Sequence, residues 1–444
     1  MDDDRLGTAV IGKVRWRILP FLILCFFIAF LDRVNVGFAA LQMNQDLGFT
    51  PEVYGLGAGL FFIGYFFFEI PSNLALHRFG ARRWIARILV TWGVLAVGMA
   101  WVGGTTSFYV MRFLLGAAEA GFFPGVLLYM TYWFPREARA RVMATFSLGS
   151  VVSLVIGAPL SGLILSAAGG GGLANWQWLF VIEGVPAVLL GIATLFVMTD
   201  RPADATWLAE HEKRWLAQTL AAEAAARPAE ARMGALATLK DPRAVLLAFA
   251  AMLNIVAIYG ISLWLPQIVK SVGGLSNLEV GLVSALPFLC TAVAMMLNAR
   301  HSDRHGERRF HILVPAVLGG CGFVLAALSA DPLVGLAGLC VAAMGIWCAN
   351  TVFWTVPMRI FSGVSAAAAL GLINSIGNLG GFVGPYLTGW IRQVSGGYPA
   401  ALITLGCALA AFGVVVFAFL TVAERRGSRE AAPVGAGLST GADL

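Results

Sequence analysis

HRFGARR at residues 77–83 returns as DRHGERR at residues 303–309, and 226 residues separate the two copies. A second pair of matching features, Pro159 in GAPLSG and Pro385 in GPYLTG, has the same separation. Two independent matches at one offset indicate an internal repeat. The chain is therefore predicted to consist of two halves of like topology.

The composition between these motifs is too apolar for a soluble protein. Of the 444 residues, 59% are hydrophobic and 12% are charged, whereas soluble domains carry about 25% charged residues. Twelve segments are long enough to cross a hydrocarbon core about 30 Å thick, and backbone in lipid must satisfy its own hydrogen bonds as helix. The predicted spans are residues 18–40, 54–76, 84–102, 108–132, 143–166, 177–198, 244–266, 278–299, 311–330, 333–357, 367–390 and 399–422.

These spans predict an all-α membrane protein with twelve transmembrane helices in two pseudo-symmetric six-helix bundles. WLAEHEKRWLAQTLAAEAAA at 207–226 predicts a surface helix in a polar linker between the bundles. The run Asp2–Asp4 and the Gly/Ala-rich tail are expected to be disordered. The predicted divisions are an N-terminal bundle at 1–199, a cytoplasmic linker at 200–243, a C-terminal bundle at 244–426 and a disordered cytoplasmic tail at 427–444.

The distribution of positive charge predicts the orientation. Arginine and lysine precede the first span, fill the loops after the second, fourth and eighth spans and follow the last span, whereas the opposite loops hold only Lys270 and Arg392. Because positively charged loops stay in the cytoplasm, both termini are predicted to be cytoplasmic. The net charge of +6 thus reflects membrane topology, and no nucleic-acid partner is expected.

The sequence contains no nucleophile–base constellation, phosphate-binding loop or cofactor motif, so neither enzyme activity nor a cofactor is expected. The six cysteines lie in apolar spans without a CxxC pair, as is typical of small buried hydrophobic residues. His301 and His305 are one helical turn apart but lack a third ligand, so no metal site is expected.

Four ionisable residues lie inside predicted spans: Asp32 and Arg33 in the first, Arg112 and Glu119 in the fourth. A charge near the bilayer centre costs at least about 2.5–3.5 kcal/mol, so it persists only where it is paired or lines a wet cavity. Counting helical rise puts the two arginines at similar depth, and two guanidinium groups at one level suit a carboxylate ligand. Alternatively, they are packing cations neutralised by Asp32 and Glu119.

The loop motif resembles the major facilitator signature, roughly G-x3-D-R-x-G-x-R-R, although Asn73 replaces the glycine and His77 the acid. Within that superfamily the chain resembles the anion:cation symporters, and most of all bacterial tartrate transporters. Carriers of phthalate, hydroxyphenylacetate and sugar acids share most of these motifs. The stretches that carry the resemblance are FLDRVNVGFA at 30–39, GYFFFEIPSNLALHRFGARRWIARI at 64–88, AAEAGFFPGVLLYMTYWFPREARAR at 117–141, LFVIEGVPA at 179–187 and LWLPQIVK at 263–270.

The resemblance implies a secondary active transporter in the bacterial inner membrane. It would be a lipid-embedded monomer that imports a small organic carboxylate with protons by alternating access. The resemblance also assigns proton coupling to Asp32 and Glu119, and a pocket position to Tyr65. It assigns to Arg33 and Arg112 either anion binding or control of the two acids. Glu183, in the LFVIEGVPA stretch, is interpreted as structural.

The C-terminal half should complete the pocket. Asn374 and Asn378 are i, i+4 on the predicted span 367–390 and share a face, and Trp354 is a further candidate. Buried amides need partners, which a polyhydroxy acid could supply. For the two asparagines, hydrogen bonding between helices is an equal alternative.

A third group of residues is expected to gate the pathway. Glu69 falls in the cytoplasmic half of the second span, where a gate or packing role is favoured over substrate contact. The arginine-rich loops should clamp neighbouring helix ends in the outward-open state, with Asp303 holding Arg304 or a helix N-terminus. The predicted gate residues are Glu69, Arg78, Arg82, Asp303 and Arg304.

Two other functions remain open at this point. One is a proton-driven exporter of amphipathic compounds. The two intramembrane arginines argue against cationic compounds as its substrates. The other is a membrane sensor signalling through the polar linker, although the linker contains no recognisable output domain.

Overall fold

The computed structural model describes residues 3–167, 169–225, 237–361 and 363–430. Over these ranges the chain is helical, apart from short connections and a single bridge between Gly170 and Leu173. The helices of the first half are α1 (Asp3–Asp46), α2 (Pro51–Phe79), α3 (Ala81–Gly98), α4 (Thr105–Glu119), α5 (Phe122–Trp133), α6 (Arg136–Ala167) and α7 (Asn175–Val197). The later helices are α8 (Glu210–Ala225), α10 (Pro242–Lys270), α11 (Asn277–His305), α12 (Arg309–Leu328), α13 (Pro332–Phe353), α14 (Thr355–Ile360), α15 (Gly363–Ser395) and α16 (Pro399–Glu430).

The apolar segments form the expected membrane helices. Eleven segments of the described chain are long and apolar enough to cross a membrane. The remaining predicted span, 367–390, lies within α15, which is 33 residues long. Large apolar side chains such as Phe67, Leu189 and Leu297 stay exposed on the outer faces, as expected where lipid surrounds the protein. The prediction of an all-α membrane protein is confirmed.

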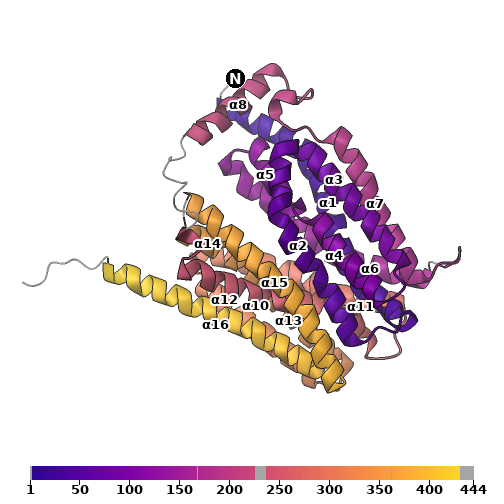
Figure 1. Ribbon diagram of the computed structural model, residues 1–444. Coiled ribbons are helices and arrows are strands. Elements are labelled where there is room, and N and C mark those ends of the chain that lie inside the picture. The colour runs from indigo at the N-terminus through magenta and orange to yellow at the C-terminus, as the bar shows by residue number, and fades with distance from the viewer. Residues whose placement is uncertain (1–2, 168, 226–236, 362, 431–444) are drawn as a thin grey trace, which may run out of the picture.

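The two halves lie side by side in Figure 1, with α1 to α7 in the indigo to magenta part and α10 to α16 in the orange to yellow part. α2 packs along α15, α6 packs along α11, and α1 contacts α10. Glycines permit two of these contacts. A side chain on Gly55 would collide with α15 beside Gly389, and one on Gly281 would collide with α6 beside Gly162.

The internal repeat relates these two contacts to each other. Gly55 and Gly281 are 226 residues apart, and Gly162 and Gly389 are 227 apart. The second helix of each half therefore meets a late helix of the other half through the same type of close glycine contact. The repeat offset found in the loop motifs thus also relates the glycine contacts between the halves.

Both ends of the described chain are more helical than expected. α1 begins at Asp3 and α16 runs to Glu430, so the expected disorder is wrong for residues 3–4 and 427–430. Residues 1–2 and 431–444 lie outside the described residues. The physical reason at the first end is support from α8, because Lys13 forms an ion pair of 2.8 Å with Glu212.

The predicted span 108–132 is wrong in one respect, because it is not one continuous helix. α4 ends at Glu119 and α5 begins at Phe122. Gly121 between them has φ +87°, which side chains disfavour. A side chain there would also come within 2.2 Å of the Ser72 hydroxyl. The break therefore depends on glycine, and it lies directly after an intramembrane acid.

Candidate functional site

Arg33 on α1 lies where the two halves meet. Its Nη2 donates to the carboxylate of Glu119 on α4. Its Nη1 donates to the hydroxyl of Tyr259 on α10, 3.1 Å away. Only 14% of the Arg33 side chain and 1% of that of Glu119 is exposed. One guanidinium thus holds an acid of its own half and a phenol of the other half in a nearly dry environment.

Aromatic rings surround this ion pair. The Arg33 guanidinium carbon is 5.4 Å from the centre of the Phe61 ring, 5.5 Å from that of Tyr65 and 5.7 Å from that of Phe30. Such cation–π contacts are worth about 0.5–2 kcal/mol each. The rings also displace water, which strengthens the electrostatic interaction between Arg33 and Glu119.

Arg112 has a different role from Arg33. It is 1% exposed, and its guanidinium donates to backbone carbonyls of α2, at 3.1 Å to Ala58 and 3.4 Å to Gly57. Phe61 lies next to both arginines, since the Arg112 guanidinium carbon is 5.1 Å from its ring centre. Arg112 therefore joins α4 to α2. Its Nη1 has no hydrogen-bond partner among the described residues.

Asp32 is adjacent to Arg33 in sequence but not in its contacts. It is 1% exposed and accepts from the Asn35 amide at 3.4 Å. Successive residues on a helix point about 100° apart, so Asp32 faces the interior of its own bundle while Arg33 faces α4 and α10. Of the four intramembrane charges singled out in the sequence, the structure joins only Arg33 and Glu119 as an ion pair.

The chain matches the family model "Major Facilitator Superfamily" over residues 22–385 and 274–441. The chain belongs to the major facilitator superfamily. An Agrobacterium vitis protein named "Putative tartrate transporter" is 48% identical to it over 96% of this chain and 93% of its own length. A "Quinolone resistance transporter" from Acinetobacter baumannii is 42% identical over 92% of this chain and 94% of its own length.

Structural comparison agrees with this assignment. The crystal structure of a bacterial homologue of the human lysosomal transporter Spinster, inward-facing and unoccupied, superposes with a TM-score of 0.72. The match covers 95% of this chain and 99% of the other at 17% identity, a level that shows the fold alone. Together these relatives show that the protein is an integral membrane transporter, and the resemblance to tartrate transporters is confirmed.

Among the predicted pocket residues of this transporter, Asn374 forms a hydrogen bond to another helix. Its amide donates to Glu69 on α2 at 3.0 Å, which joins the two halves. Asn378 and Trp354 are half-buried. Trp354 lies at the break between α13 and α14 and packs edge-on against Phe353. Among the predicted pocket residues, Tyr65 alone contacts Arg33.

The gate residues of the N-terminal half lie around a helix terminus. The backbone N–H of Arg82 donates to the Asp200 carboxylate at 2.8 Å, so this acid caps the start of α3. The Arg78 guanidinium lies over the Phe79 ring at 5.6 Å. His77 replaces the acid of the family signature. Asp200 supplies a negative charge at this loop instead.

The C-terminal loop differs from the prediction. Asp303 pairs with Arg308 at 2.6 Å, whereas Arg304 is exposed. In this structure Asp303 thus does not form the contact with Arg304 or a helix N-terminus that is expected of the outward-open state. The reason is that Gly306 ends α11 with φ +65°, so the chain turns and brings Arg308 back to the last turn of the helix. Arg308 also donates to Ser302 there.

Sequence reasoning missed Tyr259, although a signal for it existed. Tyr259 is 226 residues from Arg33, which is the repeat offset of the loop motifs. The two residues thus occupy equivalent positions in the two halves and meet where the halves join. Applying the offset to each intramembrane charge would have identified this partner.

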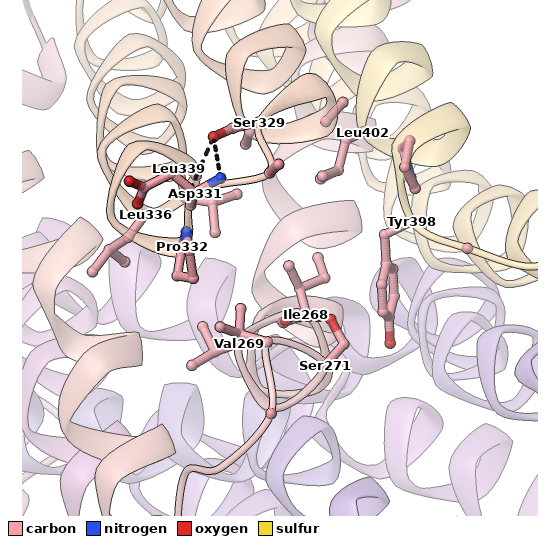
Figure 2. Close-up of a pocket in the computed structure, with 18 of the residues that line it drawn as sticks. Ile268, Val269, Ser271, Ser329, Asp331, Pro332, Leu336, Leu339, Tyr398 and Leu402 are labelled. Atoms are coloured by element: carbon pink, nitrogen blue, oxygen red, sulfur yellow. Dashed lines mark hydrogen bonds between the residues drawn. The ribbon is translucent and has the colours of Figure 1, made fainter.

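A pocket of the transporter lies away from the ion pair. Figure 2 shows it between the end of α10, the turn before α13 and the start of α16, with Ile268, Asp331 and Tyr398 among its lining residues. Its volume is about 650 Å³. None of the residues predicted to bind substrate or protons lines it. In the chain as described, no group of three His, Cys, Asp or Glu side chains is placed to hold a metal ion.

Proposed function

We propose that this transporter imports a small organic carboxylate together with protons. The observation that supports this most is the Arg33 guanidinium, which is held by Glu119 from one half and by Tyr259 from the other. Arginine recognises carboxylates with two parallel hydrogen bonds. A substrate carboxylate would therefore compete with Glu119 for the same guanidinium.

This competition provides the coupling. While Glu119 is ionised, it occupies Arg33 and repels an anion. Protonation of Glu119 removes its charge, releases the guanidinium and lets the substrate carboxylate bind between the halves. Return of the proton to the cytoplasm restores the Arg33–Glu119 pair and displaces the substrate. Binding of anion and proton is thus mutually favourable, as symport requires.

The substrate class follows from the relatives and from the charge of the site. The name of the Agrobacterium vitis relative indicates a tartrate-like acid, and sugar acids or aromatic acids would offer the same carboxylate. A second candidate is proton-driven export of amphipathic compounds, which the name of the Acinetobacter baumannii relative suggests. A buried arginine favours anions over cationic drugs.

Topology and organisation complete the proposal. We place the protein as a monomer in the bacterial inner membrane, with both termini in the cytoplasm, as the charge distribution of the loops predicts. Residues 1–199 and 244–426 would move as two bundles joined by the linker at 200–243. The glycine contacts at Gly55 and Gly281 would then close the periplasmic side.

Proteoliposomes reconstituted with the purified protein test this function. Under an inward proton gradient, labelled tartrate should accumulate, and a protonophore should abolish the accumulation. Glu119→Gln should lose the acceleration by protons but retain exchange of labelled for unlabelled tartrate, because a neutral residue leaves Arg33 free. Glu137→Gln, an exposed acid, is the matched control and should behave as the wild type.

Two outcomes would contradict the proposal. One is accumulation of tartrate, a sugar acid and an aromatic acid that stays unchanged in three cases: with the protonophore, in Glu119→Gln and in Asp32→Asn. The other is transport of a quinolone with no transport of any acid in the panel, which would favour the exporter.

A further inference from the structure

A second pair of acids lies buried inside the N-terminal half, apart from the Arg33–Glu119 pair. Asp32 on α1 and Glu183 on α7 are 1% and 2% exposed. Asn35 lies between them. It donates to Asp32 at 3.4 Å and also interacts with Glu183. The Ser161 hydroxyl on α6 donates to Glu183 at 2.7 Å. Three helices thus converge on two carboxyl groups.

The hydrogen bonding of this cluster is incomplete. One carboxyl oxygen of Asp32 and one of Glu183 have no hydrogen-bond partner in the described chain. Trp92, on α3, is fully buried and interacts with Asp32 through its side chain. Buried polar groups are normally paired. The incomplete pairing of two buried carboxyl groups therefore favours a state in which a proton lies on one of them.

No positive charge neutralises the two acids within the described residues. A third acid, Glu119 on α4, also interacts with Asp32 unfavourably. Arg33 is engaged by Glu119 and Tyr259. Two ionised carboxylates in a dry site without a counter-ion would be very unfavourable. The pair must hold a proton for much of the transport cycle.

The position of the pair links it to transport. Asp32 directly precedes Arg33 on α1, so a shift of α1 within its own bundle that frees Arg33 would also move Asp32 relative to Glu183 on α7. Separating the acids or wetting the cluster would favour release of the proton, because water stabilises carboxylates. The same helix movement would therefore control both the substrate carboxylate and the shared proton.

We propose that Asp32 and Glu183 share one transported proton, separate from the proton that Glu119 takes up, and that Glu183 is thus a proton-carrying residue. This inference rests on the proposed function. The proton adds to one carboxylate oxygen of the pair from water on the periplasmic side and leaves to water on the cytoplasmic side. Together with Glu119, the transporter then moves two protons with each dicarboxylate.

The charge balance of that cycle gives a specific readout. Two protons with one tartrate dianion transfer no net charge, so uptake by the wild type should not respond to membrane potential. Glu183→Gln removes one proton from the cycle, so each turnover would carry one net negative charge inward. An inside-negative potential should then slow uptake, while a loss of packing alone would not create this dependence.

Proteoliposomes clamped with potassium and valinomycin measure this effect with labelled tartrate. Glu183→Gln and Asp32→Asn should each lower the proton-to-tartrate ratio from about two to about one, and the double variant should do no more than either alone. Glu183→Asp should restore the ratio. Ser153→Ala, which removes a hydrogen bond from α6 to Phe27 in the same bundle, is the matched control and should keep the wild-type ratio.

The results separate this inference from the proposed function. If the wild type moves no tartrate with protons, the proposed function fails. If the wild type shows coupled uptake and Glu183→Gln keeps both the ratio and the indifference to potential, the shared proton is disproved. Should Glu183→Gln not purify, Asp32→Asn gives the same readout, and an unchanged ratio in that variant also disproves it.

Discussion

Arg33 is the residue on which the proposed chemistry depends, because a guanidinium can satisfy two partners in different directions. Nη2 donates to Glu119 and Nη1 donates to Tyr259. A lysine ammonium is a point charge that does not reproduce this planar fork. The burial of the charge is tolerated since it is paired.

Arg33→Lys should therefore lower the initial rate of tartrate uptake roughly 10- to 100-fold, which corresponds to losing one charged hydrogen bond of about 1.5–3 kcal/mol. The measurement is proton-driven uptake into proteoliposomes at a fixed protein content. Arg17→Lys changes an exposed arginine of the same helix and should have no effect. Equal uptake rates for the two variants would show that Arg33 is not part of the substrate site.

Tyr259→Phe tests the contact between the halves. Loss of the hydroxyl leaves Nη1 of Arg33 without its partner, so the KM for tartrate should rise about two- to tenfold, as expected for a hydrogen bond of about 0.5–1.5 kcal/mol. Tyr398→Phe is the matched control, because the Tyr398 hydroxyl has no partner among the described residues. An unchanged KM in Tyr259→Phe would mean that this contact does not orient Arg33.

At the scale of elements, the break between α4 and α5 positions the end of α4 at the ion pair. Glu119 is the last residue of α4. A side chain at Gly121 would collide with Ser72. Gly121 allows the turn because it adopts φ +87° without a side chain.

Gly121→Ala should destabilise the transporter by about 1–2 kcal/mol from the left-handed backbone alone. The collision with Ser72 should add to this loss. Thermal unfolding in detergent, followed by tryptophan fluorescence, should show a lower midpoint. Gly48→Ala is the control, since Gly48 also has positive φ but no neighbour within 4 Å. If both variants unfold at the same temperature, the Ser72 contact does not constrain the break.

At the scale of the whole molecule, the halves meet through glycine contacts that the internal repeat relates. Gly281 approaches α6 so closely that an added carbon would lie 3.1 Å from the α-carbon of Gly162. Alternating access requires such contacts to form and separate in each cycle. The contacts should therefore limit transport more than they limit substrate binding.

Gly281→Leu should abolish tartrate uptake while changing the equilibrium affinity for tartrate by less than about tenfold, because the wedge blocks closure without touching Arg33. Uptake and equilibrium binding on the same purified sample measure the two effects. Gly335→Leu, at a glycine with no neighbour within 4 Å, should leave both unchanged. Normal uptake by Gly281→Leu would show that transport does not require this close contact to form.

Much of the fold could be predicted before the structure, because membrane insertion depends on length and hydropathy along a single segment. Each predicted span falls on a helix or a helix pair, including 367–390 within α15. Charge alone also named Arg33 and Glu119 as candidates, and the structure joins these two residues as an ion pair. The sequence did not identify Asn35 and Trp92, which complete the Asp32 cluster, because these residues carry no charge.

The partners of the charged residues were decided by the tertiary structure. The sequence placed Arg112 and Glu119 in one span and Asp32 beside Arg33, yet Glu119 pairs with Arg33 while Arg112 binds carbonyls of α2. Hydropathy and internal repeats are properties of the sequence itself, so the sequence alone predicts a helical membrane protein with two related halves. Ion pairs depend on how each helix is rotated and how closely two helices approach. Those quantities exist only once the bundles are packed.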